Sequence, residues 1–279
     1  MRIVRSRAEL REARAALESP VGFVPTMGAL HEGHASLVRR ARAECKSVVV
    51  SIFVNPRQFG PSEDFSRYPR DEAADLAVLE SLGVDVAFLP SVEEIYPPGH
   101  ATSVEVGRLG EVLEGAARPG HFGGVATVVS ILFNLIRPGW AYFGQKDGQQ
   151  SVVIRHLVRD LGMPIEIVVC PTVRERDGLA TSSRNRYLTP EERAQAPILH
   201  RALQAAASAY ADGERSADQL RQLMRNGLAQ ATLATPDYVS VADAHTLEEL
   251  EIVERTALAS LAVSFPSARL IDCLPLDGA

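Results

Sequence analysis

Short apolar segments alternate with stretches of helical periodicity through the first two thirds of the chain. The apolar segments predict five strands, at residues 21–26, 47–55, 84–90, 141–144 and 165–173. Helical spacing of apolar positions predicts four helices between them, at about residues 34–44, 71–82, 122–136 and 148–161. Strands that are apolar at nearly every position are typical of a parallel sheet buried on both faces. The pattern therefore predicts a doubly wound α/β domain with right-handed crossovers.

Near residue 188 the pattern changes to helices followed by strands. The segment TPEERAQAPILHRALQAAASAYADG predicts one helix, with Thr189 as its N-cap, Pro190 in its first turn and Gly213 beyond its end. A helix near residues 216–231 follows, and then three strands, at residues 237–244, 255–265 and 268–276. We therefore expect two domains: residues 1–187 with the parallel sheet, and residues 188–279 as a smaller α+β domain.

Composition and charge narrow the class of protein. The chain has 279 residues, is 46% hydrophobic and 23% charged, and carries a formal net charge of -6, which argues against nucleic acid as its main partner. Its three cysteines are too far apart for a disulfide framework or a zinc knuckle. The first residues are too charged for a signal peptide, and no apolar run is long enough to span a bilayer. We expect a cytoplasmic enzyme without a membrane partner.

Two histidines lie where the first predicted strand passes into a helix, in the segment VGFVPTMGALHEGHASLV. Ligands of open α/β sheets bind beyond the carboxyl ends of the strands, and a helix N-terminus attracts phosphate. Gly28 and Gly33 allow a phosphate to approach the backbone. His31 and His34 can then donate hydrogen bonds and offset charge on a leaving pyrophosphate. The alternative is that the histidines only cap the helix.

Further polar segments follow the other predicted strands. In NPRQFG, Asn55 and Gln58 can orient a polar substrate, or the segment is an ordinary Asn-Pro turn. In QKDGQQ, Lys146 can hold a phosphate and Asp147 a metal or a ribose hydroxyl, or the two form a solvated pair. Gln150 lies in the same segment.

Two more segments carry candidate anion-binding groups. RERDGLATSSRNRYL, residues 174–188, offers hydroxyls and guanidinium groups that suit a triphosphate when a mobile loop closes over it. RPGHFGG, with Arg118 and His121, is either a lid or a bend. The chain has no GxSxG, Walker A or GxGxxG motif. The combination favours attack on a nucleotide phosphate by a bound substrate, which the protein positions while it neutralises charge.

Several motifs occur together in a recognisable order: PTMGALHEGHASLV, FVNPRQF, RYPR, RPGHFGGVATVV, FGQKDGQQ, TVRERDGLATSSRNRYL and RLID. The first resembles the HxGH signature of the nucleotidyltransferase superfamily. The ordered set, which covers almost the whole chain, resembles the pantothenate synthetase (pantoate–β-alanine ligase) family. The resemblance implies a homodimer with a Rossmann-like N-terminal domain and a smaller C-terminal lid domain. It also implies a two-step reaction, in which pantoate and ATP with Mg²⁺ form pantoyl adenylate and pyrophosphate, and β-alanine then displaces AMP.

The resemblance also implies residue roles. It assigns catalysis to His34 (the proton donor), His31, Lys146, Ser182, Ser183 and Arg184. It assigns ATP binding to Met27, Gly28, Ala29, Leu30, His31, Glu32, Gly33, His34, Gly144, Gln145, Lys146, Asp147, Val173, Thr181, Ser182, Ser183 and Arg184. Gln58 and Gln150 match residues that contact pantoate, the first also β-alanine, and Asp75 is a candidate for the acidic residue near the metal.

Five positions depart from the family's pattern: Arg57, Gln145, Gly148, Thr181 and Cys273. They bear on adenine packing and on the shape of the substrate pocket, and not on the type of reaction. Three other functions remain open. They are a related ligase or nucleotidyltransferase with a different substrate, a nucleotide-binding regulator without catalysis, and a zinc module built on His31, His34 and His121.

Overall fold

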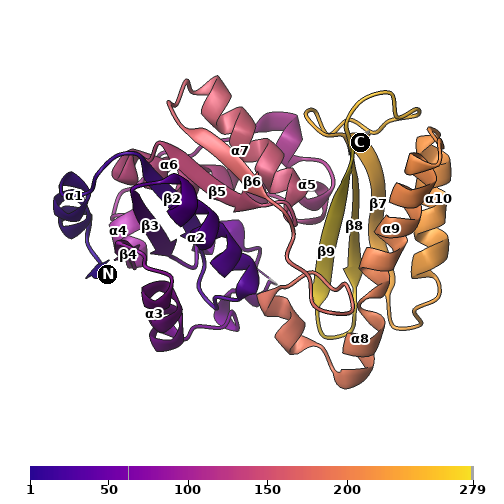
Figure 1. The fold of residues 1–279 in the computed structure, drawn as a ribbon, viewed down its shortest axis with the longest axis horizontal. Coiled ribbons are helices and arrows are strands. Elements are labelled where there is room, and N and C mark those ends of the chain that lie inside the picture. The colour runs from indigo at the N-terminus through magenta and orange to yellow at the C-terminus, as the bar shows by residue number, and fades with distance from the viewer. Residues whose placement is uncertain (62, 278–279) are drawn as a thin grey trace. The chain divides into compact units, whose positions relative to one another are not determined.

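The computed structural model describes residues 1–61 and 63–277, and Figure 1 shows the course of the chain. The residues group into two compact units. The first comprises Met1–Glu111, Arg118–Gly144 and Val153–Cys170. The second comprises Val112–Ala117, Gln145–Val152 and Pro171–Ala279. The second unit thus begins before the boundary expected at residue 187, and it takes in two segments from the N-terminal half of the chain.

A parallel sheet forms the centre of the first unit. Its six strands within the described residues are β1 (Arg2–Val4), β2 (Val21–Thr26), β3 (Ser47–Ile52), β4 (Val86–Phe88), β5 (Trp140–Gly144) and β6 (Glu166–Cys170). They lie in the order β1-β4-β3-β2-β5-β6, and each pair of neighbouring strands is parallel. The predicted Rossmann-like doubly wound sheet is confirmed. Of these six strands, only the three-residue edge strand β1 was not predicted, because its apolar run is too short to be distinguished from its surroundings.

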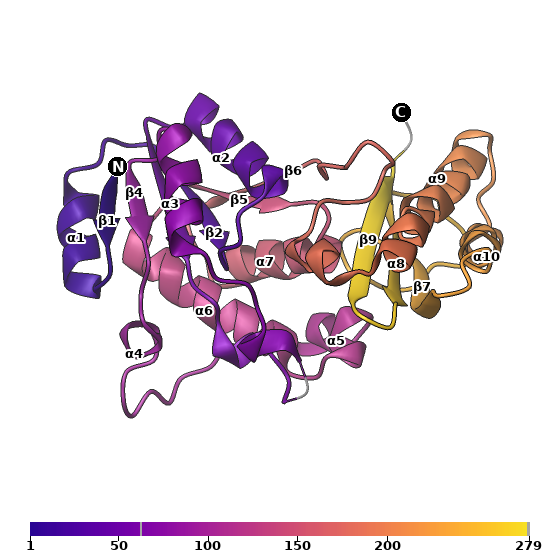
Figure 2. The same cartoon turned by 90° about the horizontal axis from the view of Figure 1, so that it is seen from below.

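Helices cover both faces of this sheet. The helices of the first unit are α1 (Arg7–Ala15), α2 (Glu32–Glu44), α3 (Glu72–Ser81), α4 (Val92–Ile95), α6 (His121–Ile136) and most of α7 (Gly148–Asp160). Helices α2 and α3 pack on one face, and α1, α6 and α7 pack on the other (Figure 2). This two-sided burial explains why the strands are apolar at nearly every position.

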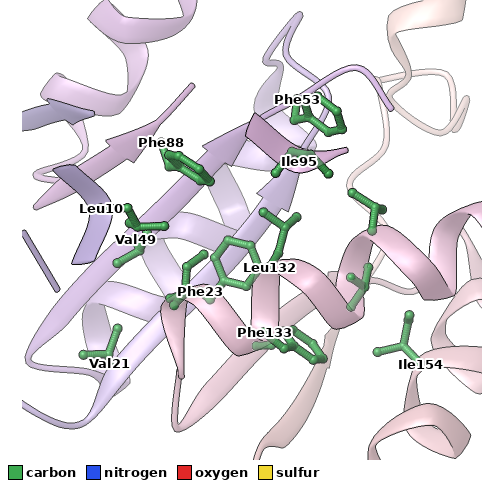
Figure 3. Close-up of a cluster of buried hydrophobic side chains, with 14 of the residues drawn as sticks. Leu10, Val21, Phe23, Val49, Phe53, Phe88, Ile95, Leu132, Phe133 and Ile154 are labelled. Atoms are coloured by element: carbon green, nitrogen blue, oxygen red, sulfur yellow. The ribbon is translucent and has the colours of Figure 1, made fainter. Parts of the chain in front are cut away.

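Successive side chains of β2 point to opposite faces of the sheet. Phe23 lies in the core under α6, where its ring meets Phe133 edge-on with centroids 6.2 Å apart (Figure 3). Val24, the next residue, lies in the core under α2. Both side chains are fully buried, and each such burial contributes about 1.5–3 kcal/mol to stability. The strand is therefore fixed in register from both faces.

The second unit pairs helices with a small antiparallel sheet. Its strands within the described residues are β7 (Thr235–Asp243), β8 (Ala257–Ser264) and β9 (Arg269–Leu276), in that order. Its helices there are α5 (Glu114–Ala117), α8 (Pro190–Gln195), α9 (Ile198–Ala211) and α10 (Ala217–Leu228), and α9 and α10 share one apolar core with the sheet. The predicted smaller α+β domain is confirmed as a fold.

The prediction of a single helix after residue 188 is wrong in one respect. The capping box is present, since Thr189 Oγ1 accepts the Glu192 N–H at 3.3 Å and Glu192 Oε2 accepts the Thr189 N–H at 2.7 Å. The helix ends at Gln195, however, and α9 begins after Pro197. Proline has no N–H to donate and its ring obstructs the preceding turn, so the chain divides into α8 and α9 there. Gly213 lies beyond α9 with a φ of +105°, as expected of a helix stop.

In the described part of the chain, no helix combines the length and the apolar character needed to cross a membrane.

Candidate active site

The order of the strands determines where a ligand is expected to bind. It runs from β2 through β3 and β4 in one direction and from β5 to β6 in the other, so the reversal lies between β2 and β5. In doubly wound sheets, ligands bind at the carboxyl ends of the strands at this point. Met27–His34 follows β2, and Gly144 ends β5. These two predicted segments therefore lie at the carboxyl ends of neighbouring strands.

The paired histidines form the start of α2. His31 is the N-cap, and its Nδ1 accepts the Gly33 N–H at 3.2 Å. His34 Nδ1 accepts the His31 N–H at 3.4 Å, and the two rings are in contact, with centroids 4.1 Å apart and planes tilted by 35°. A neutral imidazole that accepts at Nδ1 carries its proton on Nε2. Capping therefore leaves both rings in the tautomer that can donate from Nε2. Capping of the helix and donation to a phosphate are thus compatible functions of the same two histidines.

Two glycines are required by this geometry. A Cβ on Gly33 would lie 2.9 Å from both Nδ1 and Cε1 of His31, so any side chain there would displace the capping ring. Gly28 has a φ of +82°, and a Cβ on it would lie 2.9 Å from Asp75 Oδ2. The glycines therefore allow the backbone to pass close to the groups that fix the loop.

Asp75 fixes the loop between β2 and α2. This carboxylate of α3 is only 4% exposed, and it accepts the Ala29 N–H at 2.9 Å and the Leu30 N–H at 2.7 Å. It thereby satisfies two backbone donors in a turn where Ala29 has a φ of +50°. Sequence reasoning missed this role and considered Asp75 only as a neighbour of a metal, which stays a prediction.

The amide pair after β3 is ordered by a buried asparagine. Asn55 is 1% exposed, and its Nδ2 donates to Gly124 O and to Gln58 Oε1, each at 3.1 Å. Its Oδ1 accepts the Tyr96 hydroxyl at 2.8 Å. Gln58 Nε2 in turn lies 3.1 Å from Met27 Sδ. The structure therefore brings Gln58 beside the predicted ATP segment, with Asn55 holding its orientation.

The glycine-rich segment expected to be a lid or a bend is the start of α6, and it anchors Gln58. His121 Nδ1 donates to Gln58 O at 2.8 Å, and Arg118 donates to the same oxygen at 3.2 Å. A Cβ on Gly124 would lie 2.3 Å from Arg57 O, so α6 packs directly against this turn. Arg118 also forms a close ion pair with Glu63, at 2.5 Å.

The other predicted residues belong to the second unit. Lys146 and Asp147 form a pair at 3.5 Å, in a turn whose Gln145 carbonyl accepts the Cys273 thiol at 2.9 Å. Gln150 follows in the first turn of α7. Predicted site residues thus form two groups, one in each compact unit.

The loop of residues 171–188 is ordered by contacts within the second unit. Thr181 N–H donates to Val173 O at 2.9 Å, and Ser182 Oγ accepts the Arg184 N–H at 3.3 Å at the start of a 3₁₀ helix, Ser183–Tyr187. The buried carboxylate of Asp272 accepts two hydrogen bonds from Arg174, at 2.6 and 3.0 Å. No sequence signal links residues 174 and 272, so this contact was not predicted.

A zinc module on His31, His34 and His121 does not fit the structure. The described residues include no group of three or more His, Cys, Asp or Glu side chains able to hold a metal ion. The Nδ1 atoms of His31 and His34 accept backbone N–H groups, and His121 is hydrogen-bonded through both ring nitrogens to Gln58 and Arg118. The zinc hypothesis is therefore wrong for this part of the chain.

An α/β sheet with a histidine pair and a helix N-terminus at its switch point is typical of enzymes that bind a nucleotide there. Residues 2–275 match the Pantoate-beta-alanine ligase family. The chain belongs to this family, whose members are ligases.

Individual relatives agree with this assignment. The chain is 63% identical over 273 residues to a pantothenate synthetase of Chloroflexus aggregans, with 98% of each chain covered. It is 52% identical to the pantothenate synthetase of Thermus thermophilus, whose crystal structure covers 99% of this chain and 100% of its own with a TM-score of 0.95. A pantoate-beta-alanine ligase of Francisella tularensis, solved with beta-gamma ATP and beta-alanine, is 35% identical with a TM-score of 0.82, over 98% of this chain and 97% of its own.

A Gly33→Ala substitution tests the packing of the histidine pair. Because the new Cβ would meet the His31 ring, we expect the rate of pyrophosphate release to fall by about tenfold or more. The matched control is Gly139→Ala, where the nearest atoms to a new Cβ lie at 3.8 and 3.9 Å. Equal rates in the two variants would show that the ring position does not matter.

The ion pair of Glu63 with Arg118 predicts a pH dependence of stability. Burial alone raises the pKa of Glu63, but the hydrogen bond and charge of Arg118 outweigh it, so the pKa lies below the ordinary 4.5. A depressed pKa contributes stability that is present above about pH 4.5 and lost as the pH falls through the folded-state value. We expect Glu63→Gln to lower the free energy of unfolding by about 1 kcal/mol near pH 7, and by progressively less below about pH 4.5.

Thermal unfolding measured across this pH range checks the prediction. The exposed pair Arg159–Asp160 supplies the control, because Asp160→Asn removes a solvated partner and should change little at any pH. A difference between Glu63→Gln and the parent protein that is independent of pH would contradict the argument.

Proposed function

We propose that this chain condenses pantoate with β-alanine at the expense of ATP, through a pantoyl adenylate. The observation that carries the proposal is the His31–His34 pair, whose rings contact each other and which caps α2 at the carboxyl end of β2 and is held in one tautomer. Membership of the pantoate-beta-alanine ligase family supports the choice of substrates. The Francisella enzyme, which was solved in complex with beta-gamma ATP and beta-alanine, supports it further.

In the first step, a carboxylate oxygen of pantoate attacks the α-phosphorus of ATP. The bond from that phosphorus to its bridging oxygen breaks, and pyrophosphate leaves with the electron pair. The Nε2–H groups of His31 and His34, the N-terminus of α2 and the Lys146 ammonium stabilise the charge that gathers on the departing phosphates. Ser182, Ser183 and Arg184 add hydroxyl and guanidinium donors to the same phosphates.

In the second step, the amine of β-alanine attacks the acyl carbon of the adenylate. The carbon–oxygen bond to AMP breaks, the nitrogen loses a proton, and pantothenate forms. Gln58 and Gln150 hold pantoate, and Gln58 also contacts β-alanine. Because Asn55 and Met27 fix the Gln58 amide before any substrate binds, little entropy is lost in orienting it.

Magnesium enters this reaction as part of the ATP substrate. Mg²⁺ usually keeps several water ligands and binds substrate phosphates together with one or two carboxylates. Asp75 is our candidate for such a carboxylate, although its oxygens already accept the Ala29 and Leu30 N–H groups. We also propose a cytoplasmic homodimer with a C-terminal lid domain of residues 188–279, as the family resemblance implies. Light scattering on the purified protein tests the dimer.

A different carboxylic acid substrate would need a changed pocket, and Arg57 and Gly148 are the departures that leave room for one. The Arg57 guanidinium lies over the Tyr96 ring, 4.4 Å from the centroid, and donates to Thr102 O at 3.5 Å. A cation stacked in this way already has a partner of its own. We therefore favour pantoate as the acid.

Pyrophosphate release from ATP tests the proposed function directly. With Mg²⁺ and pantoate, we expect a burst of about one pyrophosphate per active site, because the adenylate stays bound until an amine arrives. Addition of β-alanine should start continuous turnover, and chelation of Mg²⁺ should abolish both phases. A panel of other carboxylic acids is the control. Folded protein that binds ATP but releases no pyrophosphate with pantoate would refute the ligase assignment. Release with another acid instead would show that the chain uses that acid as its substrate.

Two substitutions test the assignment of the phosphate site. We expect His34→Ala and Lys146→Ala each to lower the adenylation rate by roughly 10²–10³, since each removes a positive or donor group from the developing charge. Lys46→Ala, at the only other lysine of the chain, and His156→Ala are matched controls that should retain normal rates. Near-normal adenylation in both site variants would show that the phosphates bind elsewhere.

A further inference from the structure

The turn that carries Lys146 is held by the second unit. Gly144 ends β5 of the first unit, yet the next residues, Gln145–Val152, group with the second. A catalytic lysine requires a fixed turn, because an error of about 1 Å in position can cost 10²-fold in rate. The contacts that fix this turn therefore determine how well Lys146 can act.

One contact is made by Gln149, the second residue of α7. Its side chain is 6% exposed, and its Oε1 accepts the Glu114 N–H at 2.9 Å. Its Nε2 donates to Val112 O at 2.8 Å. Both ends of one amide thus bind backbone groups of the short segment Val112–Ala117, which leaves the first turn of α7 little freedom to rotate.

The segment that Gln149 binds is itself anchored to the sheet. The Glu114 carboxylate accepts two hydrogen bonds from Arg269 of β9, at 2.7 and 2.8 Å. Burial alone lowers the pKa of Arg269, but hydrogen bonds and charge from Glu114 and Asp237 raise it above its ordinary value. Arg269 therefore remains charged, and the ion pair connects β9 through Glu114 to Gln149.

A second contact joins the turn directly to the same strand. The Cys273 thiol of β9 donates to Gln145 O at 2.9 Å. A Cβ on Gly148 would lie 2.8 Å from Cys273 Sγ and 2.8 Å from Leu258 Cδ2, so the turn packs against β8 and β9 without space between. Burial and the nearby Asp272 raise the pKa of Cys273 to about 12, which keeps the thiol protonated as a donor.

We propose that Gln149 is a positioning residue for Lys146 and Gln150, which it holds through its two hydrogen bonds to Val112 and Glu114. The inference rests on the proposed function, because it assumes that these two residues bind the phosphates and pantoate. In this proposal Gln149 acts through these two residues and not by contact with a substrate. It fixes the orientation of the first turn of α7. Gln150 lies on this first turn, and the turn that carries Lys146 leads into it.

The test compares Gln149→Met with Gln195→Met in the full-length protein. Methionine retains the volume of glutamine and removes its hydrogen bonds. Gln195 is a matched control in the same unit, since its Oε1 accepts the Leu233 N–H at 3.0 Å and it lies on α8. We expect both variants to lose melting temperature, Gln149→Met the more because it is buried and loses two backbone hydrogen bonds. A fall in adenylation kcat/KM of about tenfold or more, with a raised KM for pantoate, is expected for Gln149→Met only.

A double variant separates positioning from general destabilisation. If Gln149 acts through Lys146, its substitution should cost much less than tenfold in kcat/KM for ATP when Lys146 is already alanine. The comparison is made at saturating pantoate, where the contribution through Gln150 is removed. The same tenfold loss in both backgrounds, or equal kinetics of the Gln149→Met and Gln195→Met proteins, would overturn the proposal. Gln149→Ala serves as a second variant if the methionine side chain packs poorly.

The outcomes also separate this inference from the proposed function. If the parent protein releases no pyrophosphate with pantoate, the ligase assignment fails and this inference falls with it. If the parent is active and Gln149→Met behaves like its control, the ligase stands and the positioning role alone is refuted.

Discussion

The need to satisfy backbone N–H groups at the start of α2 governs the chemistry of the first unit. A helix start carries unpaired donors, which make it a good place for phosphate and a costly one to bury. Here the Ala29 and Leu30 N–H groups bind Asp75, and the N–H groups of His31 and Gly33 bind the two imidazoles. Capping thus selects the tautomer in which each ring can donate to a ligand. One set of hydrogen bonds both closes the helix and prepares the site.

Two half-buried arginines, Arg118 and Arg174, serve as structural connectors rather than as surface charges. Arg118 joins the start of α6 to Glu63 and Gln58, while Arg174 joins the 171–188 loop to Asp272. In each case a guanidinium group forms several hydrogen bonds at once, which its planar fork of donors makes possible. These side chains hold the non-helical segments that carry candidate ligand-binding residues. Their loss would change the geometry of those segments before it changed the core.

Much of the fold could be predicted because its signals are local. Apolar runs identified β2 to β6, and the capping box of Thr189 identified the start of α8. The His31–His34 segment was also found from sequence, since a strand, glycines and a helix start lie within a few residues. The division at Pro197 was missed because the apolar spacing continues across it, although the proline itself was a visible signal.

The parts that could not be predicted depend on contacts between distant residues. Asp75 reaches Leu30 across 45 positions, and Arg174 reaches Asp272 across 98. Neither pair has a periodicity or a motif that a single sequence reveals. Gln149 stood inside a recognised motif, yet its burial and its two backbone partners appear only in the folded chain. Sequence therefore identified residues that resemble ligand contacts, and structure identified the residues that hold them.

Two departures from the family pattern, Gly148 and Cys273, lie at positions that contact each other. The family resemblance implies that Gly148 stands where an aromatic residue is usual, and Cys273 where an asparagine is usual. Even a Cβ at position 148 would lie 2.8 Å from Cys273 Sγ and from Leu258 Cδ2, so an aromatic ring cannot fit beside this packing. The thiol that fills the space also donates to Gln145 O in the lysine turn. Gly148 and Cys273 together keep the turn in contact with β9 through a pair of small residues.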